Sequence, residues 1–197
     1  GPSEIGVIAD RSASPIYVAA DLLSQAEHDK LARAILVTDS EELADQVEAE
    51  LDRQLKELPR EKIARASIEN NGRIILAPSK EAMFELMNQV APEHLEIAMD
   101  DAYSYLEQVE NAGSVFLGHY TSEPIGDYYA GANHVLPTTS TSRFSSALGV
   151  YDFIKRIQYT QYSRAAVGAA DKDITSLAYA EGLQGHAKAI EARRQEK

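Results

Sequence analysis

Short apolar runs alternate with amphipathic stretches through residues 1–117. A continuous apolar run such as 34–38 is typical of a parallel strand that is covered on both faces. Because five such runs are separated by stretches with helical spacing, the pattern predicts an α/β fold with a Rossmann-like parallel sheet and helices on both faces. The predicted strands span 5–10, 34–38, 73–77, 94–98 and 114–117.

Helical signals fill the intervals between these strands. Pro15 suits the first turn of a helix over 15–29, whose apolar residues recur three or four positions apart. Ser79 is the predicted N-cap of a helix that continues to about Val90. Ligands of parallel sheets usually bind beyond the carboxyl ends of the strands, so we expect the site at that edge. The other predicted helices begin at 39 and at Pro59 and span 102–110.

Residues 118–147 break this rhythm with a long loop that is rich in Gly, Pro, Thr and Ser. A stretch of this length without secondary structure in a compact domain is usually functional. Helical periodicity returns over 148–162, and a final helical region over 173–195 is interrupted by two glycines. We therefore expect an α/β domain over 1–147 and a helical C-terminal extension over 148–197.

Composition limits the classes of function. The net charge of −12 disfavours nucleic acid and anionic membranes as partners, because the summed field repels them. No apolar run approaches the ~18 residues of a membrane span, and no signal peptide opens the chain, so we expect a cytoplasmic location. The chain has no cysteine, which excludes disulfides, thiolate ligands and a thiol nucleophile. Any metal must therefore be held by His, Asp, Glu or Gln.

Gln25 and His28 stand three residues apart at the end of the first predicted helix, so they are expected to share one face of its last turn. An amide oxygen and an imidazole nitrogen that project together can bind a borderline metal such as zinc. An exposed pair at a helix C-terminus is also typical of a solvated surface, where histidine interacts with the helix dipole. The pair alone leaves both interpretations open.

Two further groups combine a carboxylate with an imidazole. Glu93 and His94 begin a predicted strand, where they form either an ordinary strand-edge pair or a general acid–base pair on a rigid element. Asp127 and His134 lie within the long loop, where Asp side chains usually make local turn hydrogen bonds. A fifth histidine, His119, is interpreted as a loop residue.

Glu181 and His186 occupy apolar stripes of the C-terminal extension. Glu181 follows Ile174, Leu177 and Ala178 at helical spacing, and His186 lies between two apolar residues of the next turn or helix. An isolated buried charge costs several kcal/mol, so each group is expected to have a partner. A structural salt bridge and a ligand site both meet that requirement.

Four stretches of the sequence resemble the histidinol dehydrogenase family. They are Gly-Pro-Ser-Glu at 1–4, Ala-Asp-Leu-Leu-Ser-Gln-Ala-Glu-His at 20–28, Pro-Glu-His-Leu at 92–95, and Gly-Asp-Tyr-Tyr-Ala-Gly-Ala-Asn-His-Val-Leu-Pro-Thr at 126–138. The matches occur in the family's order and, with His186, extend over nearly the whole chain. This family consists of NAD- and zinc-dependent enzymes that oxidise L-histidinol to L-histidine through an aldehyde, the last step of histidine biosynthesis.

The resemblance implies a role for each candidate residue. His94 would accept the alcohol proton of the first oxidation, and Glu93 would activate the water that hydrates the aldehyde, a route that needs no cysteine. Zinc would orient the imidazole and amino groups of the substrate. The implied zinc ligands, which also contact substrate, are Gln25, His28, Asp127 and His186; the other implied substrate contacts are Ser3, His94, His134 and Glu181.

The chain departs from the family in length and in its cofactor site. Family members are much longer, and their N-terminal half supplies most of the NAD site, whereas this sequence has no Gly-x-Gly-x-x-Gly fingerprint. We therefore expect a C-terminal fragment that is inactive by itself. The family forms intertwined homodimers, so the resemblance also implies that two copies exchange the extension and that His186 is donated in trans.

Two alternatives remain open from the sequence. The chain could be a non-catalytic module that binds zinc and imidazole-like ligands, or a structural fragment in which the motifs persist without a formed site. Zinc stoichiometry separates the structural fragment from the other two.

Overall fold

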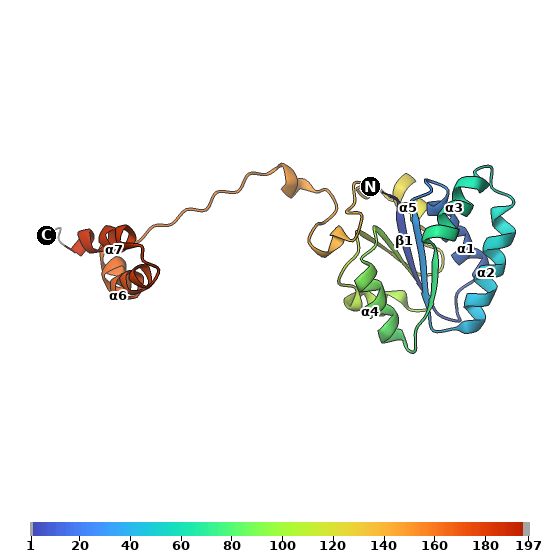
Figure 1. Ribbon diagram of the computed structural model, residues 1–197, viewed down its shortest axis with the longest axis horizontal. Helices are drawn as coiled ribbons and strands as arrows, with labels where there is room; N and C mark the ends of the chain where they lie inside the picture. Colours follow the sequence, from blue (N-terminus) through green and yellow to red (C-terminus); the bar gives the residue numbers. More distant parts are fainter. Residues whose placement is uncertain (1, 195–197) are drawn as a thin grey trace. The chain divides into compact units, whose positions relative to one another are not determined.

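The computed structural model describes residues 2–194, and its first part is a parallel sheet with helices around it (Figure 1). The five strands pair in the order β3-β2-β1-β4-β5, and every pairing is parallel. The predicted parallel α/β fold is therefore confirmed. The strands are β1 (Glu4–Ala9), β2 (Arg33–Thr38), β3 (Arg73–Leu76), β4 (His94–Ala98) and β5 (Ser114–Leu117).

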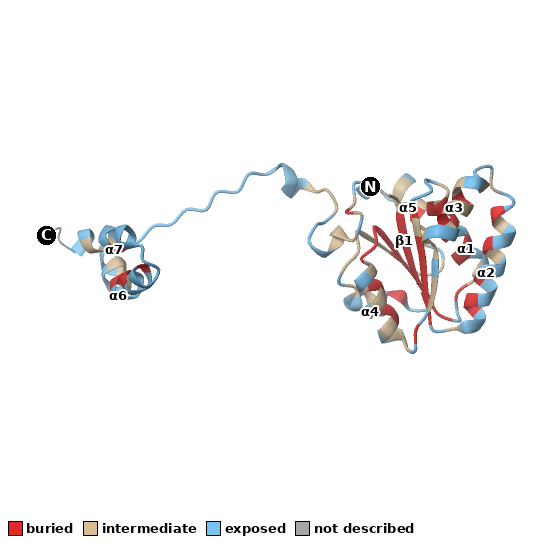
Figure 2. Cartoon of the chain, in the orientation of Figure 1, coloured by how far each residue is buried: buried red, intermediate tan, exposed pale blue. Residues whose placement is uncertain are grey.

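Helices cover both faces of this sheet, and buried residues concentrate in the strands and in the helices that pack on them (Figure 2). One core contains Val7 and Leu36 and is covered by α1 (Pro15–Ala26), α2 (Glu41–Leu55) and α3 (Glu61–Asn71). The other core contains the next residues along the same strands, Ile8 and Val37, because successive side chains of a strand point to opposite faces. It is covered by α4 (Lys80–Val90) and the 3₁₀ helix η1 (Ala102–Gln108).

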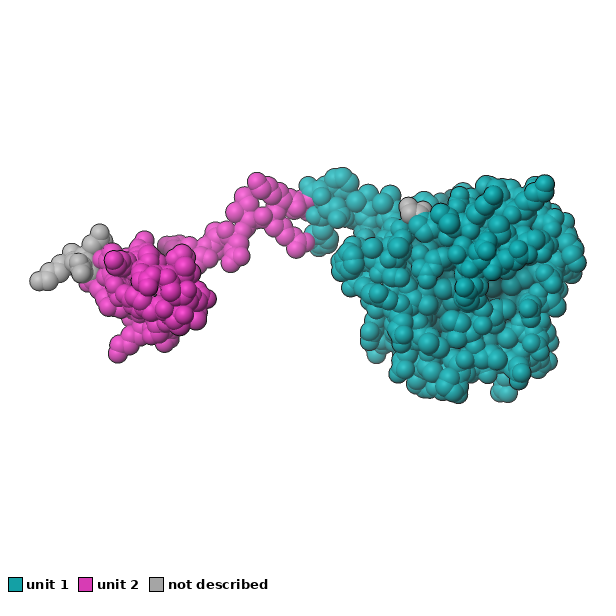
Figure 3. Space-filling view, viewed as in Figure 1, with its two compact units in different colours: residues 1–153 teal, residues 154–197 magenta. Residues whose placement is uncertain are grey.

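The chain divides into two compact units, residues 1–153 and residues 154–197 (Figure 3). The second unit contains α6 (Arg164–Ala180), α7 (Gln184–Glu191) and the 3₁₀ helix η4 (Ala192–Arg194). Within residues 2–194, no helix is both long enough and apolar enough to span a membrane.

Four of the predicted elements differ from the structure. The first helix ends at Ala26 rather than at 29, and the long loop contains a helix, α5 (Glu123–Tyr128), and a 3₁₀ turn, η2 (Thr141–Arg143). The helix predicted over 148–162 is replaced by one 3₁₀ turn, η3 (Val150–Phe153), followed by residues without regular structure. The last helical region begins at Arg164 instead of 173.

The missing helix over 148–162 has a physical explanation. Helical spacing stabilises a short helix mainly when its apolar stripe packs against something. Here the stripe is uncovered, since Ile154 is 50% exposed and Ile157 is 77% exposed.

Candidate active site

The predicted acid–base pair lies at the amino edge of the sheet. His94 is the first residue of β4, where it pairs with Ile5 of β1, and Glu93 directly precedes it. Both are buried, with 2% of His94 and 8% of Glu93 exposed. The expected position beyond the carboxyl ends of the strands is therefore wrong for this pair, because its residues occupy the start of a strand rather than the loop that follows one.

Glu4, the first residue of β1, holds both members of the pair through its backbone. Its N–H donates a hydrogen bond to Glu93 Oε2 at 3.1 Å, and its carbonyl oxygen lies 3.0 Å from His94 Nδ1. Because a carbonyl can only accept, Nδ1 carries the proton, and Nε2 of the neutral ring is an acceptor. The Glu4 carboxylate also accepts from the N–H of Thr139 at 3.1 Å and pairs with Arg33 at 3.2 Å, which ties the long loop to this edge.

Burial moves both groups of the pair toward their neutral forms. It lowers the pKa of His94 from its ordinary value of 6.5. It raises the pKa of Glu93 above 4.5, although the hydrogen bond from Glu4 opposes that rise. A neutral imidazole and a carboxylate with increased proton affinity are both suited to accept protons near neutral pH.

The helix α5 brings two further carboxylates to His94. Glu123 and Asp127 are four residues apart on this helix, so they share one face. Glu123 is 2% exposed, and its backbone N–H donates to Glu96 Oε1 at 2.7 Å. Its Oε1 lies 3.6 Å from His94 Nε2, and neither atom has a hydrogen-bond partner within residues 2–194. Buried polar atoms without a partner are typical of catalytic or ligand-binding positions.

Two buried carboxyl groups, Glu96 on β4 and Glu123 on α5, have raised pKa values. Burial raises the pKa of Glu96 to about 9, and the neighbouring Asp21 adds to the rise. Burial also raises the pKa of Glu123 to about 8, with a further contribution from Asp127. A protonated carboxyl is neutral, so the interior accommodates several acids without uncompensated buried charge.

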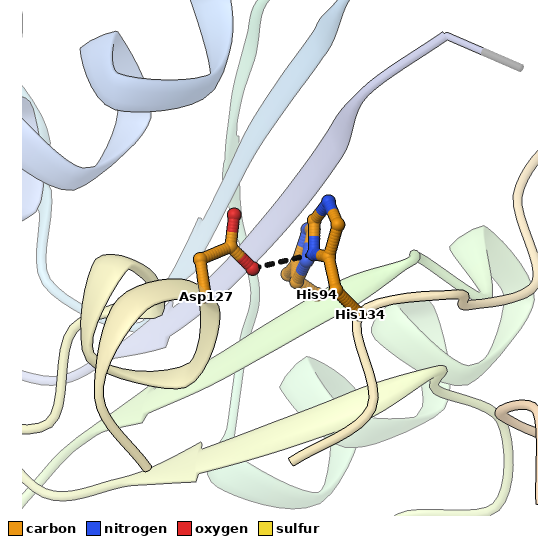
Figure 4. A group of neighbouring side chains, drawn as sticks. All are labelled: His94, Asp127 and His134. Carbon is orange, nitrogen blue, oxygen red and sulfur yellow. Dashed lines mark ion pairs between the residues drawn. The ribbon is translucent and has the colours of Figure 1, made fainter. Parts of the chain in front are cut away.

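His134 reaches the same cluster from the long loop (Figure 4). Its Nδ1 pairs with Asp127 Oδ1 at 2.6 Å, and its ring stacks on that of His94 with centroids 6.2 Å apart and planes 18° apart. One nitrogen or oxygen atom from each of these three side chains lies within 4.8 Å of the others. The three groups are therefore close enough to share a metal ion, although this grouping contains only Asp127 from the predicted ligand set.

Gln25 and His28 have different surroundings. Gln25, in the last turn of α1, is 1% exposed, and it lies close enough to Glu123 to lower the pKa of that carboxyl group. His28 follows the end of the helix and is exposed, and together with Ser3 it lines a surface hollow of about 440 Å³. The prediction that Gln25 and His28 share a helical face is therefore wrong. His28 is still near enough to His94 for its charge to contribute to the lowered pKa of that residue.

Glu181 and His186 belong to the second unit, where both side chains are exposed. Glu181 is the C-cap of α6, and His186 lies in the first turn of α7. Of the predicted apolar stripe of α6 only Ala178 is buried, since Ile174 is 38% exposed and Leu177 is 64% exposed. Neither charged group is buried within this unit, so the argument that burial requires a partner for each does not apply there. The buried residues of α6 are Asp171, Thr175 and Ala178.

His119 lies at the carboxyl edge of the sheet, away from the cluster. Its Nε2 is 3.1 Å from Asp100 Oδ1 and 3.4 Å from Ser12 Oγ. These three residues follow β5, β4 and β1, so their contacts connect the loops at that edge.

Comparison with known proteins gives a consistent result along the chain. The family model described as histidinol dehydrogenase matches residues 1–194. The chain belongs to the histidinol dehydrogenase family. It is 79% identical over 193 residues to the histidinol dehydrogenase of Streptococcus mutans serotype c, and 54% identical over 196 residues to that of Listeria monocytogenes serotype 4b.

The histidinol dehydrogenase of Elizabethkingia anophelis has a crystal structure that matches this chain with a TM-score of 0.87 and 39% identity, covering 99% of this chain and 45% of that one. The chain spans about half the length of the curated relatives it matches, since 98% of it aligns with 45% of the S. mutans protein and all of it aligns with 46% of the L. monocytogenes protein.

Sequence reasoning about histidinol dehydrogenase motifs overlooked two residues of this cluster, Glu4 and Glu123. Glu4 belongs to one of the matching motifs, but the resemblance implies no role for it. Glu123 lies outside the matching text, although one signal was available: Ser122 and Pro124 are the N-cap and first-turn residues of α5, a combination that predicts a helix start.

Proposed function

We propose that the protein containing this chain catalyses the NAD-dependent, four-electron oxidation of L-histidinol to L-histidine through the aldehyde. The observation that carries the proposal is the buried pair of Glu93 and His94, which Glu4 holds beside a cluster of carboxylates and imidazoles. The overall reaction consumes one alcohol and one water and yields one carboxylate, two hydrides and three protons. A site for this reaction therefore needs groups beside the reacting carbon that accept protons from the alcohol and from the water.

His94 is the proposed base for the alcohol proton. Its Nδ1 is committed to the carbonyl of Glu4, which leaves Nε2 as the accepting atom. Because burial lowers its pKa, the ring is neutral and ready to accept a proton near neutral pH.

Glu93 is the proposed base for the water that hydrates the aldehyde. A sequence without cysteine cannot form a thiol adduct of the aldehyde, so hydration is the route that its residues support. The raised pKa of Glu93 makes its carboxylate a stronger base than an exposed one. The hydrogen bond from Glu4 fixes one of its oxygens, Oε2, and leaves Oε1 for water.

The donor atoms at this edge fit a zinc ion. They are nitrogens and oxygens only, and Asp127 adjoins buried atoms that have no hydrogen-bond partner among residues 2–194. We assign the zinc ligands as Gln25, His28, Asp127 and His186. When bound, zinc orients the imidazole and amino groups of the substrate. Ser3, His134 and Glu181 are the proposed further contacts to substrate.

The β1–α1 turn does not fit the dinucleotide fingerprint, because residues 10–14 contain no glycine to let a pyrophosphate approach the backbone. No residue of this chain is therefore assigned to NAD, and we expect the 197-residue polypeptide alone to show no turnover of histidinol.

We also propose a homodimer in which two copies exchange the C-terminal extension. The exposed apolar residues of α6 support this assignment, because an uncovered apolar stripe needs a surface to pack on. His186 and Glu181 lie beyond that stripe and would reach the site of the second copy.

Metal analysis and kinetics test these assignments in a full-length polypeptide that contains the 197 residues. The comparison uses His28→Ala, His134→Ala and the control His119→Ala, whose residue lies at the opposite edge. We expect wild type and the control to retain zinc, His28→Ala to lose it, and His134→Ala to retain it with a raised KM for histidinol.

The other outcomes select among the alternatives. Loss of zinc in His134→Ala with retention in His28→Ala would transfer the metal to the His94, Asp127 and His134 grouping. A zinc-loaded wild type that does not oxidise histidinol would favour a non-catalytic zinc and imidazole-binding module. A wild type without zinc would favour a structural fragment.

A further inference from the structure

Glu4 has a buried side chain that the proposed chemistry does not use. Its backbone holds Glu93 and His94, but any residue type would supply the same backbone contacts. The carboxylate is 3% exposed, so its charge needs partners. Oε1 lies 3.2 Å from the guanidinium of Arg33, its register partner on β2, and Oε2 accepts the N–H of Thr139 at 3.1 Å. One oxygen therefore pairs with a cation of the sheet, and the other holds the backbone of the long loop.

The loop has an unfavourable backbone conformation at the point where Glu4 holds it. Thr139 and Ser140 have φ angles of 56° and 60°, a left-handed region that residues other than glycine seldom adopt and that disfavours a β-branched residue such as Thr. Such a conformation persists only where surrounding contacts hold it. The hydroxyl of Ser140 provides one contact by donating to the carbonyl oxygen of Val90, at the end of α4, at 2.8 Å. The Glu4 carboxylate provides the other.

This anchor lies a short distance along the chain from His134. Residues 131–138 have no regular secondary structure, so no internal hydrogen-bond ladder fixes the position of His134. Its ring stacks on that of His94 (Figure 4), although 62% of its side chain is exposed. The support nearest to it toward the C-terminus is the buried Pro137 followed by Thr139. The position of the histidine therefore depends on how firmly Thr139 is held.

We propose that the Glu4 carboxylate is a positioning residue that, through the N–H of Thr139, keeps His134 in place beside His94 for contact with the substrate. The inference rests on the proposed function, in which His134 contacts histidinol. In this way one residue aligns two parts of the site, the acid–base pair through its backbone and the substrate-binding loop through its side chain. Loss of the side-chain contact should weaken substrate binding and leave the proton transfers intact.

Steady-state kinetics of the full-length polypeptide test this role. Glu4→Met keeps the buried volume and the backbone contacts but accepts no comparable hydrogen bond, so KM for histidinol should rise about 10–100-fold with little change in kcat. Glu4→Gln has an oxygen that can accept from Thr139 and should remain closer to wild type. The control Arg33→Met removes the ion pair and leaves the hydrogen bond, so its KM should equal that of wild type. Equal increases of KM in Glu4→Met and Arg33→Met would overturn the proposal.

A double variant shows whether Glu4 acts through His134. Residues that act through one contact give effects that do not add, whereas independent residues give factors of KM that multiply. In the His134→Ala background, Glu4→Met should therefore raise KM no further. A multiplied increase in the double variant would mean that Glu4 supports the site by another route, and the positioning role would be wrong.

Hydrogen exchange followed by mass spectrometry examines the loop without reference to activity. In Glu4→Met the amides of residues 131–141 should exchange faster than in wild type, because their anchor is lost. The amides of α2 should exchange at the wild-type rate, which separates a local opening from a general loss of folding. Unchanged exchange over 131–141 would overturn the anchor.

The failures of the two proposals can be told apart. If wild type oxidises histidinol and Glu4→Met has the wild-type KM, the positioning role is wrong and the proposed function stands. If wild type does not oxidise histidinol, the proposed function is wrong, and the role of Glu4 in substrate binding falls with it.

Discussion

At the scale of single residues, the backbone of Glu4 holds both Glu93 and His94, which are adjacent in sequence. The N–H of Glu4 occupies one oxygen of Glu93, while its carbonyl oxygen sets the tautomer of His94. Burial then raises the proton affinity of the carboxylate and keeps the imidazole neutral. The two residues are thereby suited to separate proton transfers at one carbon.

Glu93→Gln is expected to impair aldehyde oxidation more than alcohol oxidation. Glutamine can retain the hydrogen bond from Glu4 but cannot accept a proton from water, so the hydration step should slow by about 10²–10⁴-fold. Single-turnover kinetics started from histidinol and from the aldehyde would separate the two steps in the full-length polypeptide. Equal losses for both substrates would contradict the water-activating role, and the exposed Glu85→Gln serves as the control.

Glu96→Gln is expected to stabilise the protein above neutral pH. Burial raises the pKa of Glu96 from 4.5 to about 9, so between these values the folded protein holds a proton that the unfolded chain releases. The stability due to this group is complete below its unfolded pKa and is lost as the pH rises through its folded pKa. Glutamine keeps an oxygen to accept the N–H of Glu123 and has no proton to release.

Thermal unfolding measured from about pH 5 to about pH 9 checks this sign. The variant should gain on wild type as the pH rises and differ little at the acidic end. Parallel curves for the two proteins would show that Glu96 titrates as an exposed carboxyl does. The exposed Glu107→Gln should follow wild type throughout.

The sequence predicts Glu93 and His94 as site residues because both belong to one short motif and their side chains carry the proposed chemistry. Glu4 and Glu123 could not be predicted in this way, because their importance comes from pairing across the sheet. Glu4 holds this pair through its backbone, which any residue type would supply, and Glu123 acquires its neighbours only when α5 packs against β4 and α1.

At the scale of elements, α5 is the piece that completes the cluster and the piece that hydrophobic spacing missed. Six residues are too few for a helical period to be recognised, and Pro124 and Gly126 within them are typical of loops. The helix persists because it packs on the sheet: a Cβ at Gly126 would lie 2.7 Å from the ring of Phe116 on β5. Close approach to that ring is therefore why glycine occupies this position.

Gly126→Ala is expected to displace α5 and weaken the site that it carries. The added methyl group overlaps the ring of Phe116, and such overpacking typically costs about 1–3 kcal/mol. Because Asp127 is the next residue, zinc affinity should fall together with the free energy of unfolding. The double variant with Phe116→Leu should recover part of both losses.

The control for this prediction is Gly149→Ala, which would meet only one atom, at 3.9 Å, and should leave both quantities unchanged. Denaturant unfolding and chelator competition measure the two effects. Unchanged values in Gly126→Ala would mean that α5 tolerates displacement without consequence for the site.

In the C-terminal helical region, spacing predicts a helix but does not predict which of its faces is buried. Helical spacing predicts one apolar face with Ile174, Leu177 and Ala178, yet Ile174 and Leu177 are exposed, and the buried residues of α6 are Asp171, Thr175 and Ala178. Spacing identifies which residues share a face, whereas the surface that covers a face depends on what else the chain or a second copy supplies.

At the scale of the whole molecule, the two units divide the proposed site. Gln25, His28 and Asp127 belong to residues 1–153, and Glu181 and His186 belong to residues 154–197. The chain corresponds to about half the length of its curated relatives, so the complete reaction is a property to be tested in the longer polypeptide. The remaining question is which copy's second unit serves a given first unit.

Mixing two inactive variants of the full-length polypeptide answers this question. One variant carries His28→Ala in the first unit, and the other carries His186→Ala in the second. If tails are exchanged, one site of each heterodimer receives both lesions and the other site receives none. Random subunit exchange makes about half of the dimers heterodimers, so activity and zinc content should return to about a quarter of the wild-type value. If each tail serves its own chain, every site of the heterodimer keeps one lesion. Activity that stays at the level of the single variants, after exchange is confirmed by mass spectrometry of differently tagged subunits, would therefore place His186 in the site of its own copy.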